Sequence, residues 1–175
     1  MKKFIFTLAV TMSGITAFSQ DIIRTHKGET IEGKVTEMGD RTIKFKYSGE
    51  DMINSLSKNL VSEIKFESGR TQKVSEKIEI NGEQDWEKVI ITNLESDVAG
   101  LTRVGEIMAK AQNNWSYTTN VGKLEKKAMD KLKRDAAKQG CHAILILTTT
   151  SKAGNNRETL SGAPKASVTG VMYKY

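Results

Sequence analysis

Cysteine and histidine are nearly absent from this sequence, and their scarcity excludes several kinds of site. The chain has 175 residues, with one Cys and two His. One Cys cannot form an intramolecular disulfide or a Cys-based zinc cluster, and two His cannot supply a three-His zinc site. The sequence also lacks the G-x-S-x-G, H-E-x-x-H and G-x-x-x-x-G-K-[ST] motifs. We therefore expect no catalytic residue, metal ligand or cofactor, and predict that the chain is not an enzyme.

Proline is equally scarce, with one residue, and aromatic residues make up 6% of the chain. The low content of Gly plus Pro argues against a collagen-like or low-complexity chain. The hydrophobic content of 38% is ordinary for a globular protein, which argues against disorder. The length permits one ordinary domain or two small ones.

Residues 1–19 have the features of a secretory signal peptide. Two Lys follow Met1, and residues 4–18 are apolar apart from Thr, Ser and Gly. Ala17 and Ser19 are small residues at positions −3 and −1 of a cleavage site before Gln20. A membrane-anchoring helix is the alternative, but the apolar stretch is about 15 residues long and a bilayer requires about 20.

We expect the mature protein to be periplasmic or secreted. No later segment is apolar for long enough to span a membrane, and the only Cys, Cys141, lies too far from the cleavage site for a lipid anchor there. Cleavage removes two Lys and lowers the formal net charge from +6 to +4. Outside the inner membrane, the polyanions that a basic protein meets are lipid head groups and envelope polymers, so we expect no nucleic-acid partner.

The charge is distributed unevenly along the chain. Residues 21–80 hold 11 basic and 11 acidic side chains, residues 81–122 sum to −3, and residues 123–175 sum to +7. We therefore expect an electrostatic partner, such as an envelope protein or an anionic envelope polymer, to contact the C-terminal third.

Residues 20–75 show the alternation of a small antiparallel β-barrel domain. Apolar residues alternate with polar ones over segments separated by Gly-centred turns every 8 to 12 residues. A linker at 76–88 follows, ending near Trp86, which we interpret as a packing residue rather than a ligand contact. The strands are expected at 22–25, 30–38, 42–47, 61–66 and 71–74, with a polar loop at 48–54.

Residues 89–175 predict an α+β domain in the order β-β-α-β-β. Apolar residues recur at three- and four-residue steps from Val121 to Ala136, and Gly140 fits the end of a helix. The pattern favours one main helix packed on a mostly antiparallel sheet. The strands are expected at 89–91, 98–109, 143–147 and 166–175, with loops at 112–120 and 153–164.

Two parts of the chain resemble known families. The stretch KKAMDKLKRDAAKQGCHAILIL (126–147) followed by SVTGVMYKY (167–175) resembles the helix-strand unit of the YbjQ-like and RcsF-like group. For members in the envelope, this resemblance implies an α+β fold and a role in sensing surface stress or in protein interaction. The RcsF-like members have paired cysteines and this chain has only Cys141, so their disulfide-based mechanism cannot be transferred. The N-terminal half resembles the small SH3-like or Sm-like barrels of exported bacterial proteins.

Cys141 and His142 are adjacent, as in a nucleophile-base or metal site. Neighbours in a strand point to opposite faces, so we interpret Cys141 as a structural residue. His26 lies in a turn and is predicted to be solvated.

The remaining candidates are contacts to a partner. Trp115 and Tyr117 lie in a polar loop, and Lys126, Lys133 and Arg134 belong to a helix with 7 basic and 3 acidic residues between 123 and 138. A solvated helix face is the alternative for these cations, and loop packing is the alternative for the aromatic residues. The sequence thus predicts a non-enzymatic interaction or sensing module of the envelope, with homo-oligomerisation left open. The runner-up is a small-molecule or metal-binding protein of the periplasm.

Overall fold

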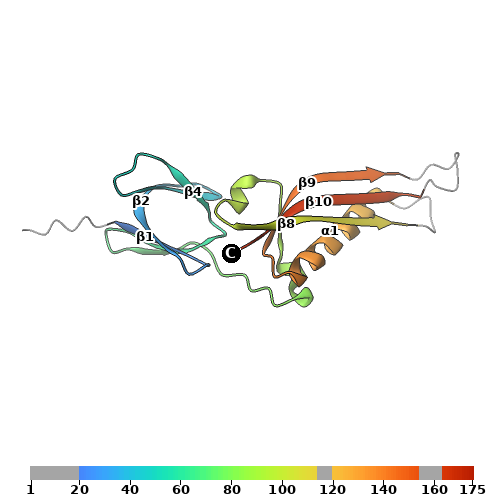
Figure 1. Ribbon diagram of the computed structural model, residues 1–175, viewed down its shortest axis with the longest axis horizontal. Coiled ribbons are helices and arrows are strands. Elements are labelled where there is room, and N and C mark those ends of the chain that lie inside the picture. Colours follow the sequence, from blue (N-terminus) through green and yellow to red (C-terminus); the bar gives the residue numbers. More distant parts are fainter. Residues whose placement is uncertain (1–19, 114–119, 154–162) are drawn as a thin grey trace, which may run out of the picture.

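The computed structural model describes residues 20–113, 120–153 and 163–175. Figure 1 shows two β-sheets that follow one another along the long axis of the molecule. The first sheet is built from residues 21–73 and the second from residues 90–174. The second sheet packs against one long helix. The expected α+β class, with mostly antiparallel sheets and one main helix, is therefore confirmed.

The N-terminal sheet has six strands in the order β4-β3-β2-β1-β5-β6, all antiparallel. Its alternation follows the sequence, because Ile43 and Phe45 are buried while Lys44 and Lys46 between and beside them are more exposed. The strands are β1 (Asp21–Thr25), β2 (Thr30–Met38), β3 (Thr42–Tyr47), β4 (Asn54–Ser57), β5 (Val61–Lys65) and β6 (Thr71–Lys73).

This sheet is open rather than closed. β4 and β6 are its two edges, and they do not pair with each other in the part of the chain that the structure describes. The closed barrel that we expected is thus not confirmed. One reason is that Val98 and Leu101, from the following unit, pack into the same hydrophobic cluster and cover apolar residues of this sheet.

The C-terminal sheet has four strands in the order β7-β9-β10-β8. β7 runs parallel to β9, and the other pairs are antiparallel. The elements are the short 3-10 helices η1 (Glu83–Lys88) and η2 (Glu95–Val98), the strands β7 (Ile90–Thr92), β8 (Thr102–Gln112), β9 (Ala143–Lys152) and β10 (Lys165–Lys174), and the helix α1 (Val121–Lys138).

The helix α1 begins and ends at the residues that its sequence predicts. The Asn120 side chain accepts a hydrogen bond from the Gly122 amide and caps the first turn, and Gly140 has a φ of 66° just beyond the last turn. The apolar face of the helix, including Leu124, Ala128 and Leu132, is buried against β8, β9 and β10. We call the sheet surface under the helix the helix side, and the opposite surface the open face.

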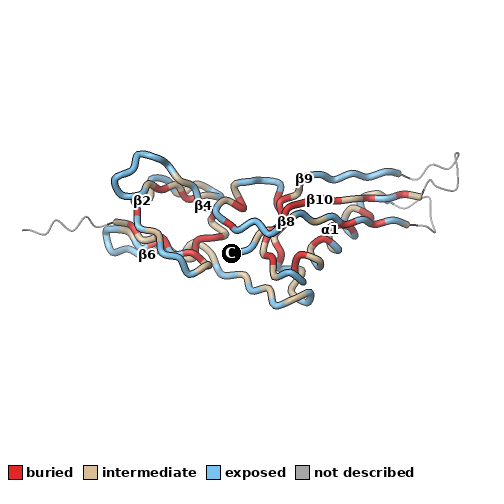
Figure 2. The backbone as a smooth tube through the Cα atoms, viewed as in Figure 1, coloured by how far each residue is buried: buried red, intermediate tan, exposed pale blue. Residues whose placement is uncertain are grey.

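A second hydrophobic cluster joins the two sheets. It contains Ile23, Phe45 and Ile64 of the first sheet together with Ala143 and Leu145 of β9. In Figure 2, buried residues continue from the first sheet to the near end of the second.

One strand was not expected, and two boundaries differ from those expected. β4 (Asn54–Ser57) begins at the end of the expected polar loop, and it forms through pairing with β3 although its residues are mostly polar. β9 continues to Lys152 instead of ending at Leu147, since Thr148 to Lys152 pair with β10 residue by residue. β8 runs from Thr102 rather than from Val98, which lies in η2.

Candidate anion-binding site

One end of the C-terminal sheet brings together four chain segments. β8 and β9 end there, and α1 and β10 begin there (Figure 1). We call this the distal end, because it lies away from the N-terminal sheet. The register of the strands decides which side chains meet there.

Two rows of residues cross the open face at the distal end. Antiparallel partners lie directly opposite each other, and their side chains share one face of the sheet. The first row is Lys110 of β8, Ser167 of β10 and Thr150 of β9, and the second row is Gln112, Lys165 and Lys152 in the same strand order. Ala111 and Ala166 lie between these rows in sequence and are buried on the helix side.

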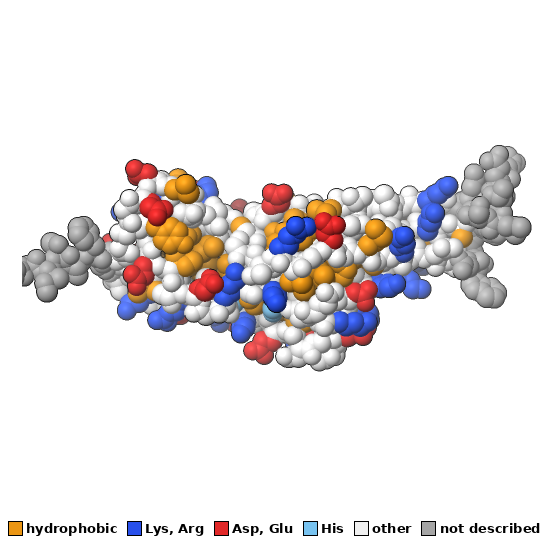
Figure 3. Space-filling view, viewed as in Figure 1, with side chains coloured by type: hydrophobic (Ala, Val, Ile, Leu, Met, Phe, Trp, Pro, Cys, Tyr) orange, Lys and Arg blue, Asp and Glu red, His pale blue; other side chains and the backbone are white. Residues whose placement is uncertain are grey.

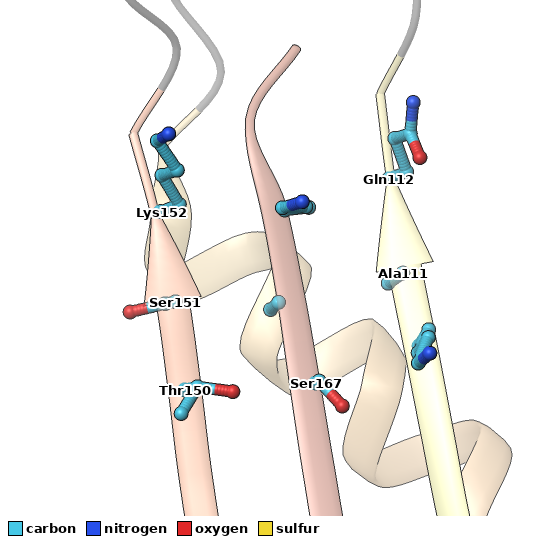
Figure 4. A pocket seen from close by; sticks show the side chains of 9 residues that line it. Ala111, Gln112, Thr150, Ser151, Lys152 and Ser167 are labelled. Atoms are coloured by element: carbon cyan, nitrogen blue, oxygen red, sulfur yellow. The ribbon is translucent and has the colours of Figure 1, made fainter. Parts of the chain in front are cut away.

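The residues of both rows line a hollow of about 270 Å³. Figure 4 shows the Thr150 and Ser167 side chains on neighbouring strands, with Lys152 nearer the strand ends. The lining of the hollow therefore includes three lysines and three hydroxyl-bearing side chains, together with Ala111 and Ala166, which lie between the two rows. We call Lys110, Lys152 and Lys165 the distal lysine site.

The charge in the distal lysine site is unbalanced. Within the described ranges, none of the three lysines forms a salt bridge, and no acidic residue lines the hollow. Lys152 and Lys165 are direct cross-strand partners, and like charges in that arrangement destabilise a sheet. Figure 3 shows basic side chains on the visible face towards this end of the molecule. An anion bound between the lysines would remove the repulsion.

The distal lysine site was not found from the sequence. We expected the relevant strands to end at residues 109 and 147, so Lys110 and Lys152 lay outside the expected strands. The alternation of Ala109, Lys110, Ala111 and Gln112 is a strand signal that could have extended the first of these strands.

The expected helix cations have different environments. Lys126 is exposed on α1. Lys133 and Arg134 lie over the ring of Trp86, at 5.5 and 4.2 Å from its centroid, and the Lys133 ammonium donates a hydrogen bond to the Glu87 carbonyl. Burial lowers the pKa of Lys133, and the charges of Asp130 and Glu87 oppose that effect. Lys133 and Arg134 thus attach η1 to α1, and Trp86 packs against the core of the second sheet.

Three other candidate residues lie outside the described part of the chain. Trp115 and Tyr117 fall within 114–119, and Ser19 of the expected cleavage site falls within 1–19. Gln20 is the first described residue, and β1 begins at Asp21.

Cys141 is fully buried in the core between α1 and the sheet. Burial raises the pKa of its thiol, which disfavours the reactive thiolate. This environment fits the structural role that we predicted.

The two histidines lie together although 116 positions separate them in sequence. The ring of Tyr175 is 5.1 Å from that of His26 and 4.1 Å from that of His142. His26 Nε2 is 2.9 Å from the Ser75 hydroxyl oxygen, and the Tyr175 amide donates to His142 Nδ1 at 3.4 Å. His26 is therefore partly buried rather than simply solvated, because the chain end folds back over its turn.

Burial lowers the pKa of both histidines, and the positive charge of Lys77 adds to the effect. Within the described residues, no three His, Cys, Asp or Glu side chains are placed to hold a metal ion. The two imidazoles and the phenol form a packing contact between the two sheets.

No protein-family model, curated protein or solved structure matches the chain. Over the described residues, the structure contains no helix that is both long and apolar enough to cross a bilayer.

Proposed function

We propose that the chain is an exported, non-enzymatic interaction module of the cell envelope, and that its distal lysine site binds an acidic polysaccharide. The observation that supports this most strongly is the direct pairing of Lys152 with Lys165 beside Lys110. Two lysines directly opposite each other destabilise a sheet when no anion is bound between them. Residues that lower stability in this way are typical of functional positions.

An acidic polysaccharide fits the groups around the hollow better than a simple ion does. Lysine ammonium groups attract carboxylate or phosphate, and the hydroxyls of Thr150 and Ser167 can donate to or accept from sugar hydroxyls. The next row of the open face is Met108, Thr169 and Thr148, so the polar surface continues along β10 and β9 but not along β8. A polymer can therefore contact several successive rows.

The resemblance to the YbjQ-like and RcsF-like group remains part of this proposal, as does that of the N-terminal sheet to SH3-like barrels. The element order β7, β8, α1, β9 and β10 is compatible with the first resemblance. In this proposal the envelope role comes from the resemblance and from the expected signal peptide.

The test is retention of the protein on immobilised polygalacturonate, a polymer of carboxylated sugars, compared with immobilised dextran, which is neutral. We expect retention on polygalacturonate only, with elution as salt rises, because screening weakens exposed charge interactions. Equal retention on both polymers, or on neither, would show that the proposed ligand class is wrong.

A further inference from the structure

In the part of the chain that the structure describes, β8 forms a long edge of the C-terminal sheet without a partner strand. β8 has 11 residues and stands last in the strand order, and within the described ranges it pairs only with β10. The backbone groups along its outer edge can therefore accept another strand. Long edges of this kind are usually protected by charges or bulges, because they otherwise pair with other chains.

The charges on β8 are arranged to permit pairing with a copy of itself. Glu106, Met108 and Lys110 alternate onto one face of the strand, with opposite charges two residues on either side of Met108. In an antiparallel pair centred on Met108, each Glu106 lies opposite the partner's Lys110. Opposite charges in direct cross-strand positions stabilise a pair of strands, and the twofold symmetry produces this contact twice.

Other registers of the same pairing are less favourable. Centring on Glu106 or on Lys110 places like charges directly opposite each other, and centring on Val104 places no opposite charges in register. Centring on Met108 also brings the two Met108 side chains together, and each is 55% exposed in the single chain. Charge and apolar exposure therefore select the same register.

We propose that two copies of this chain associate by antiparallel pairing of their β8 strands, centred on Met108. The two four-stranded sheets then form one continuous eight-stranded sheet. Because the symmetry axis is perpendicular to the sheet, the open faces of both copies point to the same side. Lys152 and Lys165 of each distal lysine site stay outside the dimer contact, while Lys110 belongs to both the site and the contact.

The experiment is a charge exchange between the two positions. Glu106→Lys alone places two lysines opposite each other, and Lys110→Glu alone places two glutamates opposite each other. The dissociation constant of the dimer, measured by sedimentation equilibrium, is expected to rise roughly tenfold in either variant. In the double variant the charges are complementary again, so dimerisation should return to the wild-type level.

Mixing the two single variants gives a sharper readout. A heterodimer of Glu106→Lys with Lys110→Glu contains only opposite charges at both contacts, so it should form in preference to either homodimer. Lys127→Gln serves as a control, because Lys127 is an exposed basic residue outside β8, and it should leave dimerisation unchanged.

All samples are purified from cells that express the full chain. A monomer at every concentration would overturn the proposal, as would a dimer that is unaffected by the single variants or not restored by the double variant. The two proposals can fail separately, because dimerisation is measured without ligand and polysaccharide retention can be measured on the Glu106→Lys variant, which keeps all three lysines of the distal lysine site.

Discussion

Asp97 connects three segments of the chain through its side chain and backbone. Its carboxylate accepts two hydrogen bonds from Arg41 and one from the Thr92 hydroxyl, at 2.6 to 3.0 Å. Its carbonyl accepts from Ser57, the last residue of β4, and from Asn59, which follows that strand. The carboxylate is mostly buried, so removing a partner leaves its charge poorly solvated.

We expect Arg41→Ala to lower the free energy of unfolding by about 2 kcal/mol. The mostly buried carboxylate of Asp97 would lose a positively charged donor that contacts both of its oxygens. Arg24→Ala is the matched control, since Arg24 pairs with the more exposed Glu63. That change should cost less than about 1 kcal/mol. Urea unfolding measures the free energy of unfolding of both variants. Equal losses would show that the Arg41–Asp97 contact contributes no more than an exposed ion pair.

The histidine pair gives a prediction about pH. Burial, with Lys77 and His26 nearby, holds the pKa of His142 below its ordinary value of 6.5. The unfolded chain therefore binds more protons than the folded chain at pH values between the folded pKa and 6.5. The contribution of neutral His142 to the free energy of unfolding is therefore fully present above pH 6.5. It is lost as the pH falls towards the pKa of His142 in the folded chain.

We expect the urea midpoint of the wild type to fall as pH is lowered through 6.5, and to fall less steeply in His142→Gln. The same comparison with His26→Gln tests the second imidazole, because burial and then the charge of Lys77 also lower the pKa of His26. An identical pH dependence in wild type and both variants would mean that neither histidine is linked to folding.

At the scale of elements, the packing of η1 against α1 depends on one aromatic ring. Trp86 of η1 lies under Lys133 and Arg134 of α1 and packs on the core of the second sheet. The sequence predicted the packing role of Trp86 but treated both cations as candidate partner contacts. The sequence places Lys126, Lys133 and Arg134 on the same basic helix. Only the fold brings Trp86 under the last two.

We expect Arg134→Gln to destabilise the fold by about 0.5 to 1 kcal/mol through loss of the contact with Trp86. Lys126→Gln, at an exposed position of the same helix, should change stability by less than about 0.5 kcal/mol. Thermal unfolding followed by tryptophan fluorescence distinguishes them. If the two variants have the same stability, the Trp86 contact contributes nothing.

Local patterns explain which elements could be predicted from the sequence. The helix was located correctly because its apolar spacing and Gly140 indicate the same segment. The distal half of β9 was missed because Thr148 to Lys152 are polar, and only pairing with β10 makes them a strand. The distal lysine site depends on that pairing, so it could not be predicted from either segment alone.

At the scale of the whole molecule, the two sheets share one hydrophobic cluster and several hydrogen bonds. Gly100 lies at this contact with a φ of 80°, and a Cβ atom there would stand 2.7 Å from Leu56 and 2.8 Å from Leu60. Lys27, from the turn after β1, donates a hydrogen bond to the Gly100 carbonyl. The division into domains at 20–75, 76–88 and 89–175 stays a prediction, but the contact between the sheets is extensive.

We expect Gly100→Ala to destabilise both sheets together, by about 1 to 2 kcal/mol, because it adds crowding to an unfavourable backbone conformation. Gly28→Ala is the control, since Gly28 has a similar φ of 89° with open space around it. It should cost about 1 kcal/mol. Circular dichroism and tryptophan fluorescence should report one shared transition in each variant, and separate transitions would show that the sheets unfold independently.

The most direct test of the proposed function is the affinity for polygalacturonate of two variants with the same net charge. Lys152→Glu with Lys165→Glu reverses the cross-strand pair of the distal lysine site. Lys34→Glu with Lys65→Glu changes the total charge equally in the N-terminal sheet. Titration calorimetry at one salt concentration should show at least about a tenfold loss of affinity in the first variant and little loss in the second. Equal affinities in the two variants would contradict binding at the distal lysine site.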